Sequence, residues 1–208
     1  MGRARRHHQL GDPLRDRRAG ASGPGGLAVE VPEGLLECER CGLSRSRTRV
    51  VVGSGPAEPT LLVIGEAPGR TEDEGGLPFI GRSGRLLFTL IEEVMGLSRD
   101  RCYVTNVVKC RPPNNRTPTR AEVGACRPWL RWQFEHVRPR AVLTLGLVAG
   151  QSVLGFSAPM GAMHGRLVTV AGRPGLGTYH PAAALRNGPS LVEVMRVDLA
   201  TLREAMGA

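Results

Sequence analysis

The stretch "TLLVIGEAPG" at residues 60–69 indicates which kind of fold this chain adopts. It is a short, continuous apolar run that ends in a turn containing glycine and proline. Such a run is typical of a strand that is buried on both faces of a parallel sheet. We therefore expect a central strand here, with Glu66 in the turn at its carboxyl end.

Strand and helix patterns alternate on the carboxyl side of this strand. Residues 83–97 have apolar positions at helical spacing after Ser83, and residues 119–137 predict a second helix, in which Pro128 implies a kink or a break. Further strands are expected at 102–108, 141–146, 166–170 and 176–180, and a closing helix at 189–206. This order predicts a three-layer α/β/α sandwich with a central, mostly parallel sheet.

Length and composition fit one globular domain behind an N-terminal tail. The chain has 208 residues, of which 41% are hydrophobic, and no apolar run approaches the ~20 residues that span a bilayer. Residues 1–33 are rich in Arg, Gly, Pro and His, which predicts a disordered basic tail, and residues 34–208 are expected to form the domain. Because the tail lacks the apolar region of a signal peptide, we expect a cytoplasmic protein without a membrane partner.

The charge of the chain predicts a polyanionic partner. The formal net charge is +9, and Lys109 is the only lysine among the 28 lysine and arginine residues. Neutralisation of phosphates provides most of the sequence-independent affinity for nucleic acid, so this excess favours a DNA or RNA partner. A compositional bias toward arginine explains the missing lysines but not the surplus of positive charge.

The five cysteines predict one metal centre and one core thiol. Cys38 and Cys41 form a C-x-x-C pair, while Cys110 and Cys126 follow later in the chain. Cys102 lies in a strand-like run, where a small buried thiol is common, and we interpret it as a core residue. The other four can hold either zinc or an iron-sulfur cluster, and their spacing alone does not decide between the two.

Three separate motifs are predicted to meet at the carboxyl edge of the sheet. They are "GEAPG" after the first strand, "TN" in the strand at 102–108 and "YHPAAALRN" after the strand at 176–180. Because ligands of open α/β sheets bind at this edge, the motifs predict a pocket. Its candidate residues are Glu66, Glu72, Asp73, Phe79, Asn106 and His180.

Each of these residues also has a purely structural interpretation. Glu66 can cap the segment after it, and Glu72 and Asp73 belong to a charge run of the kind that usually faces solvent. Phe79 can be a core residue, Asn106 can fix a loop, and His180 can be a structural histidine. Only their convergence favours a functional site.

Taken together, these motifs resemble those of the family 4 uracil-DNA glycosylases, the iron-sulfur type. The resemblance is carried by "GEAPGRTEDEGGLPFIGRSGRLL", "YVTNVVKCRPPNNRTP" and "YHPAAALRN", with the C-x-x-C pair upstream. It covers the chain from about Leu36 to the C-terminus. It implies a monofunctional DNA repair enzyme that flips uracil out of DNA and hydrolyses its N-glycosidic bond.

The resemblance also implies roles for the pocket residues. Asn106 is expected to read the polar edge of uracil, Phe79 to stack on its ring, and Glu72 to exclude thymine. His180 is expected to stabilise the leaving uracil anion, and Glu66 to position water or stabilise the sugar cation. An aspartate common in related enzymes is replaced by alanine directly after Glu66, which weakens the case for a dedicated base.

Two more expectations follow from the resemblance. Leu185 and Arg186 are expected to wedge into the DNA beside the flipped base, although a plain helix end also fits these residues. Cys38, Cys41, Cys110 and Cys126 are expected to bind a 4Fe-4S cluster, with zinc as the alternative ligand.

The resemblance implies a monomer whose partner is uracil-containing DNA. The opposing hypothesis is a non-catalytic iron-sulfur module that binds nucleic acid or carries electrons on the same fold.

Overall fold

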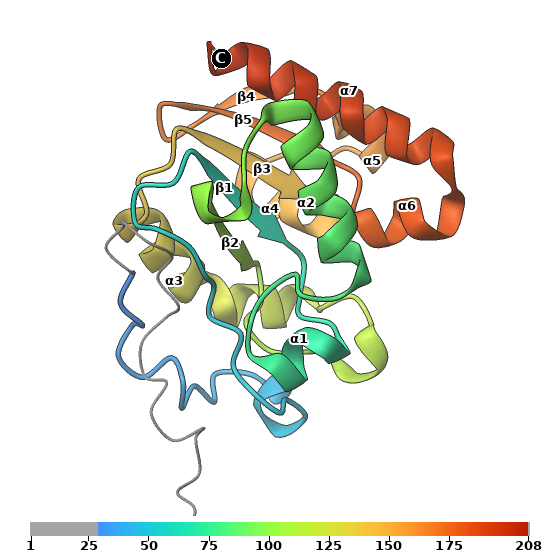
Figure 1. Cartoon of the computed structure of the whole chain (residues 1–208). Helices are drawn as coiled ribbons and strands as arrows, with labels where there is room; N and C mark the ends of the chain where they lie inside the picture. Colours follow the sequence, from blue (N-terminus) through green and yellow to red (C-terminus); the bar gives the residue numbers. More distant parts are fainter. Residues whose placement is uncertain (1–28, 208) are drawn as a thin grey trace, which may run out of the picture.

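The structure is a computed structural model that describes residues 29–207 (Figure 1). Five strands, seven α-helices and three short 3-10 turns follow one another in this part of the chain. The strands are β1 (Leu61–Gly65), β2 (Cys102–Asn106), β3 (Ala141–Leu145), β4 (Leu167–Val170) and β5 (Arg173–Thr178). The helices are α1 (Arg70–Gly75), α2 (Arg82–Met95), α3 (Arg120–His136), α4 (Leu147–Leu154), α5 (Met160–Met163), α6 (Pro181–Asn187) and α7 (Pro189–Ala205). The 3-10 turns are η1 (Gly42–Arg45), η2 (Arg99–Arg101) and η3 (Pro113–Asn115).

The strands form one sheet in the order β2-β1-β3-β5-β4. The first four are parallel, and β4 joins the edge antiparallel to β5. From β1 the chain first moves outward to β2 and then returns to the other side as β3. Ligands of open α/β sheets bind outside the carboxyl ends of the strands at such a switch of direction. Gly65 at the end of β1 pairs in register with Asn106 at the end of β2. The segments that follow these two strands therefore begin next to each other at this edge of the sheet.

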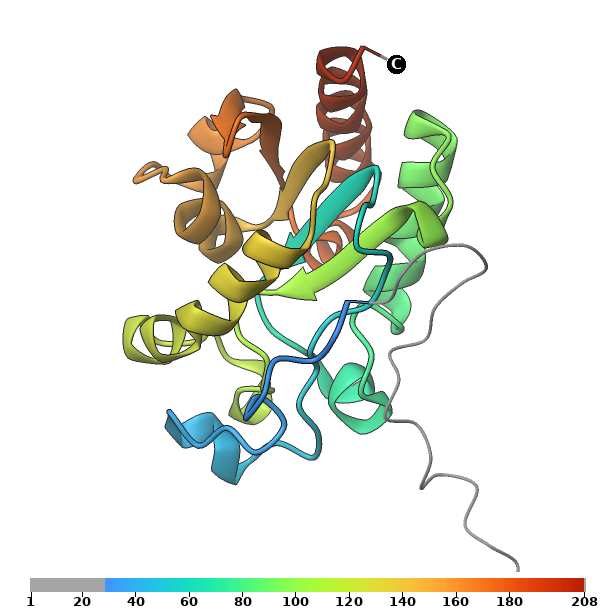
Figure 2. The same ribbon diagram turned by 90° about the vertical axis from the view of Figure 1, so that its left-hand side faces the viewer.

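Helices cover both faces of the sheet, as Figure 2 shows from the side. Leu61 and Val63 of β1 face a core cluster shared with α2, α6 and α7. The alternate residues Leu62 and Ile64 face a second cluster shared with α3 and α4. Successive side chains of a strand point to opposite faces, so a strand that is apolar throughout can be buried between two helical layers. The predicted three-layer α/β/α sandwich is confirmed.

Several local predictions need correction. Helix α3 continues through Pro128 without a break, and α2 begins at Arg82 after the N-cap residue Gly81, so Ser83 is not its cap. The strand expected at 102–108 ends at Asn106, where the chain turns away from the sheet.

Residues 1–28 of the predicted tail lie outside the described residues. Of the residues that follow, Val29 packs against the second core cluster and Pro32 is buried. In residues 29–207 none of the helices has the length and hydropathy of a membrane span.

Candidate functional site

A pocket of about 350 Å³ opens at the carboxyl edge of the sheet. Five predicted residues line it: Glu66, Glu72, Phe79, Asn106 and His180. They come from the turn after β1, the α1 region, the end of β2 and the end of β5. The structure therefore brings together residues as distant in the sequence as Glu66 and His180, which are 114 positions apart. The sixth candidate, Asp73, is buried but does not line the pocket.

His180 presents a neutral imidazole to the pocket. It is the N-cap residue of α6, and its Nδ1 accepts a hydrogen bond of 3.2 Å from the backbone N–H of Ala182. Since Nδ1 accepts, the ring proton is assigned to Nε2. Burial lowers the pKa of His180 to about 4, and the charge of Arg186 acts in the same direction. The ring therefore remains an uncharged N–H donor at neutral pH, and it both caps a helix and faces the pocket.

Phe79 is held in a strained turn beside this histidine. Its φ angle is +53°, which is unusual for a bulky residue, and its ring stacks on His180 with 5.8 Å between the ring centroids. The guanidinium of Arg99 donates to the carbonyl oxygens of Phe79 (3.0 Å) and Pro78 (2.6 Å). Gly84 of α2 packs so closely on the backbone of Phe79 that a Cβ there would overlap its carbonyl group. These contacts hold the aromatic ring at one wall of the pocket.

Two carboxylates of the pocket have different surroundings. Burial raises the pKa of Glu66, and a hydrogen bond from the Thr117 side chain acts against this rise. Glu72 accepts a hydrogen bond of 2.8 Å from the backbone N–H of Gly81, which fixes its carboxylate within the pocket wall. The charge run that contains Glu72 is thus not a solvated face, because Glu72 and Asp73 are both buried.

Asn106 carries a buried acceptor without a protein partner. Its side chain is 1% exposed and lines the pocket, and Oδ1 has no hydrogen-bond partner within the described part of the chain. A Cβ on Gly65 would lie only 2.5 Å from this oxygen and from the ring of Phe79, so residue 65 has no room for a side chain. An unpaired buried amide costs free energy unless a ligand completes its hydrogen bonds.

The four cysteines of the predicted metal centre come from three segments of the chain. Cys38 and Cys41 precede β1, Cys110 follows β2, and Cys126 lies in α3. Burial raises the pKa of Cys126 to about 11 and also raises that of Cys110, and neighbouring cysteines of the group add to both shifts. Cys110 and Cys126 belong to the same core cluster, and Cys41 packs against it. In residues 29–207 no group of three or more His, Cys, Asp or Glu side chains is arranged to hold a metal ion.

N–H groups surround the sulfur atoms of this centre. Trp129 Nε1 lies 3.2 Å from Cys38 Sγ, the backbone N of Lys109 lies 3.3 Å from Cys126 Sγ, and Arg47 Nη1 lies 3.5 Å from Cys110 Sγ. Hydrogen bonds to sulfur stabilise the thiolate form that a metal or cluster requires. The donor set thus fits a sulfur-ligated group. Cys102 lies apart in the first core cluster, as predicted, and burial raises its pKa to about 12.

The cysteine segment is tied directly to the pocket wall. Arg47 also donates to the carbonyl oxygen of Cys38 (2.5 Å). The next two backbone N–H groups, of Thr48 and Arg49, donate to the buried carboxylate of Asp73 (2.9 and 3.4 Å). Asp73 is the neighbour of Glu72 in α1, so the segment that carries the C-x-x-C pair holds the helix that lines the pocket.

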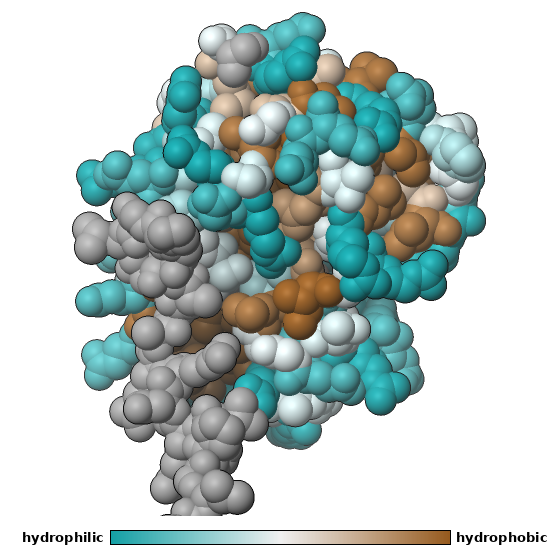
Figure 3. All heavy atoms as spheres, viewed as in Figure 1, coloured by the Kyte–Doolittle hydropathy of each residue, from teal (hydrophilic) through white to brown (hydrophobic). Residues whose placement is uncertain are grey.

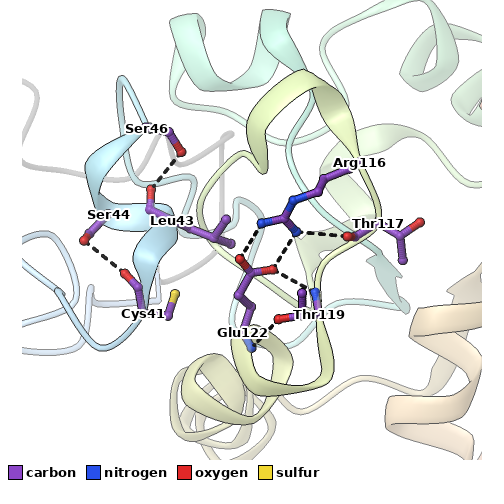
Figure 4. A network of polar contacts seen from close by, with 8 residues as sticks. All are labelled: Cys41, Leu43, Ser44, Ser46, Arg116, Thr117, Thr119 and Glu122. Atoms are coloured by element: carbon purple, nitrogen blue, oxygen red, sulfur yellow. Dashed lines mark hydrogen bonds and ion pairs between the residues drawn. The ribbon is translucent and has the colours of Figure 1, made fainter.

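The cysteine segment also approaches the loop between β2 and α3. Figure 4 shows the Arg116 guanidinium facing the Glu122 carboxylate, with Leu43 of η1 directed toward this pair. Glu122 also closes a capping box with Thr119 at the start of α3. The loop that carries Cys110 is therefore fixed where it meets α3, by the Arg116–Glu122 ion pair and the capping box.

Sequence reasoning missed several residues of the site. Ser83 and Asn115 also line the pocket, and Asn115 lies in a turn where it and Asn114 both have positive φ angles. The "PPNN" sequence signals that turn, but nothing in it shows that the turn faces the pocket.

Of the predicted wedge, Arg186 lines the pocket, whereas Leu185 lies outside it with 45% of its surface exposed. Figure 3 shows hydrophobic surface interleaved with polar surface on the face that carries α6.

Comparison with known proteins identifies the superfamily of this chain. Residues 52–200 match the uracil DNA glycosylase superfamily, and the chain belongs to this superfamily. It is similar to the type-4 uracil-DNA glycosylase of Sulfurisphaera tokodaii, with 38% identity over 84% of this chain and 83% of the relative. The type-4 enzyme of Saccharolobus solfataricus is 39% identical over 86% of each chain. That of Pyrobaculum aerophilum is 40% identical over 82% of this chain and 90% of the relative. The predicted resemblance is confirmed.

Proposed function

We propose that this protein excises uracil from DNA by hydrolysing the N-glycosidic bond, which yields free uracil and an abasic site. The observation that carries the proposal is the buried amide oxygen of Asn106, which has no partner within the described residues and lines a pocket on this fold. The type-4 relatives, which carry this activity in their names, support it. A base within a duplex is out of reach of such a pocket, so the nucleotide must first be flipped out at a cost of a few kcal/mol.

Recognition of the flipped base falls to Asn106 and Phe79. Asn106 Oδ1 accepts from uracil N3–H, and the amide Nδ2 donates to O4. Cytosine offers the opposite pattern and would leave both amide groups unpaired. The ring of Phe79 stacks on the pyrimidine, a contact worth about 1–3 kcal/mol that hardly distinguishes one base from another.

Glu72 excludes thymine by its position. Thymine differs from uracil only by the C5 methyl group, so it must be rejected sterically. The hydrogen bond from Gly81 leaves the Glu72 carboxylate little freedom to move aside for a methyl group.

Cleavage leaves negative charge on uracil and positive charge on the sugar. The Nε2–H of neutral His180 donates to uracil O2 as that charge develops, a contact that can lower the barrier by roughly 3–4 kcal/mol. Glu66, which lines the same pocket, is the carboxylate that positions water or stabilises the sugar cation. Burial raises the pKa of Glu66 because it removes water from the carboxylate, and the hydrogen bond from Thr117 opposes this rise.

DNA contacts extend from the pocket onto α6. Arg186 at the pocket pairs with a phosphate, and the exposed Leu185 beside it enters the space that the flipped base leaves. The net charge of +9 supports binding to the remaining phosphates.

Cys38, Cys41, Cys110 and Cys126 bind a 4Fe-4S cluster in this proposal, in preference to zinc. When bound, the cluster joins three chain segments and orders the loops beside the pocket, and it takes no part in bond breaking.

The only lysine, Lys109, is buried and hydrogen-bonded, so it cannot form a Schiff base with DNA and the enzyme is monofunctional. We further propose that the protein acts as a monomer in the cytoplasm.

An excision assay tests the proposal. Uracil release is measured on U:G, U:A and single-stranded oligonucleotides, with the full chain and with a chain that lacks residues 1–28, so that the packed residues Val29 and Pro32 are kept. We expect free uracil and an abasic site from the full chain. DNA binding without uracil release would contradict the enzymatic function and favour the non-catalytic binding module instead.

A further inference from the structure

The side chain of Lys109 is completely enclosed by the protein. Its Nζ lies 2.7 Å from Thr105 Oγ1, 2.6 Å from the carbonyl oxygen of Asn106 and 2.6 Å from Gln133 Oε1. An ammonium group has three N–H donors and no acceptor, so these three oxygens match its donors. All of the hydrogen-bonding capacity of Lys109 is therefore used inside the fold.

The partners of Lys109 are themselves fixed. The Gln133 amide nitrogen donates to the carbonyl oxygen of Val52 (2.7 Å) and to the Tyr103 hydroxyl (3.1 Å). The Thr105 hydroxyl lies 2.9 Å from the same Val52 oxygen. The ammonium group thus sits in a network that joins β2, α3 and the segment before β1.

The shape of this site requires lysine. The three acceptors belong to a strand side chain, to the main chain at the strand end and to a side chain of α3, so they surround one nitrogen atom. Arginine would present its donors in a rigid plane and needs more space. This explains why lysine occurs at position 109 in a chain that otherwise uses arginine for its basic residues.

Lys109 also stands directly behind the base-reading residue. Asn106 is the last residue of β2, and its side chain lines the pocket while its carbonyl oxygen binds the ammonium group. Fixing this carbonyl and the Thr105 hydroxyl restricts the backbone rotation that sets the direction of the Asn106 side chain.

We propose that Lys109 is a positioning residue that orients the amide of Asn106 toward the base, an inference that rests on the proposed function. Lys109 itself is shielded from the pocket and touches no substrate. Its effect on uracil release must therefore pass through Asn106.

A double-mutant cycle tests this role. Uracil release under single-turnover conditions is compared for the wild type, Lys109→Met, Asn106→Ala and the double variant. We expect Lys109→Met to slow release about 100-fold, as small misplacements of a reading group do. In the Asn106→Ala background the same change should cost less than about threefold, because the group that Lys109 orients is already missing.

Tyr103→Phe is the matched control. It removes one hydrogen bond from the same buried network but leaves the three acceptors around Nζ intact, so release should stay near the wild-type rate. If Lys109→Met does not fold, Thr105→Val takes its place in the cycle, because it removes only one acceptor.

The possible failures are distinguishable. Equal losses from Lys109→Met in both backgrounds, or a parallel loss of iron and activity, would overturn the positioning role. A wild-type protein that releases no uracil contradicts the proposed function, whereas an active wild type with additive losses contradicts only the role of Lys109.

Discussion

At the scale of single residues, the site depends on groups that are buried in an unusual state. His180 is the clearest case, because burial lowers its pKa to about 4 from an ordinary value of 6.5. In the unfolded chain the same imidazole takes up a proton at a higher pH. Its contribution to stability is therefore complete above about pH 6.5 and is lost as the pH falls toward 4.

His180→Asn tests this difference, because an asparagine amide can replace the N-cap acceptor of α6. We expect acidification from about pH 7 to about pH 4.5 to reduce the free energy of unfolding by roughly 2 kcal/mol more in the wild type than in the variant. Denaturant unfolding at both pH values measures this. Equal losses in the two proteins would show that His180 is not the group that titrates.

Asn106 allows a test of base selectivity. Asn106→Asp exchanges the amide nitrogen for an oxygen, so a donor that suits uracil O4 is replaced by an acceptor that suits the amino group of cytosine. We expect slower release of uracil and a shift of the preference toward cytosine, measured as the ratio of the two excision rates. An unchanged ratio would remove Asn106 from base reading.

At the scale of elements, the pocket depends on how closely α2 packs on the turn that carries Phe79. Gly84→Ala adds a Cβ that overlaps the Phe79 carbonyl, so α2 or the turn must move. We expect a loss of about 1–3 kcal/mol in stability together with reduced uracil release. Gly124→Ala in α3 is the control, because nothing lies within 4 Å of its added Cβ. It should leave activity intact and stabilise the fold by about 0.4–1 kcal/mol. Similar effects of the two changes would contradict the packing argument.

At the scale of the whole molecule, the cysteine centre brings together the segment before β1, the loop after β2 and helix α3. We expect the purified protein to be brown and to contain iron, and Cys41→Ser to reduce the iron content and to expose the segment around residues 38–49 to proteolysis. Cys102→Ala should keep the colour and the iron, because Cys102 lies in the first core cluster. Metal analysis with visible absorbance checks both variants. Colourless wild-type protein with stoichiometric zinc and no iron would rule out the cluster.

How much of the site could be predicted depends on how far apart its contacts lie in the sequence. The buried strand β1 and the polar turn after it were predictable, because apolar periodicity and turn chemistry are local properties. Of the kink or break predicted at Pro128, the break is wrong, since the packing of α3 against the sheet through residues such as Leu130 overrides the local preference of proline. Asn115 was missed because the sequence gives the turn type but not the direction in which the turn faces.

Local patterns along the chain were sufficient to predict the alternation of strands and helices, and they also indicated the types of side chain in the cysteine centre and in the pocket. These follow from side-chain period and chemical type, which short stretches contain. Three properties of the site could be found only in the folded protein: Asp73 supports the cysteine segment, Lys109 lies behind Asn106, and His180 is neutral. Those properties arise from burial and from the approach of residues far apart in the chain, and packing of the complete fold sets both.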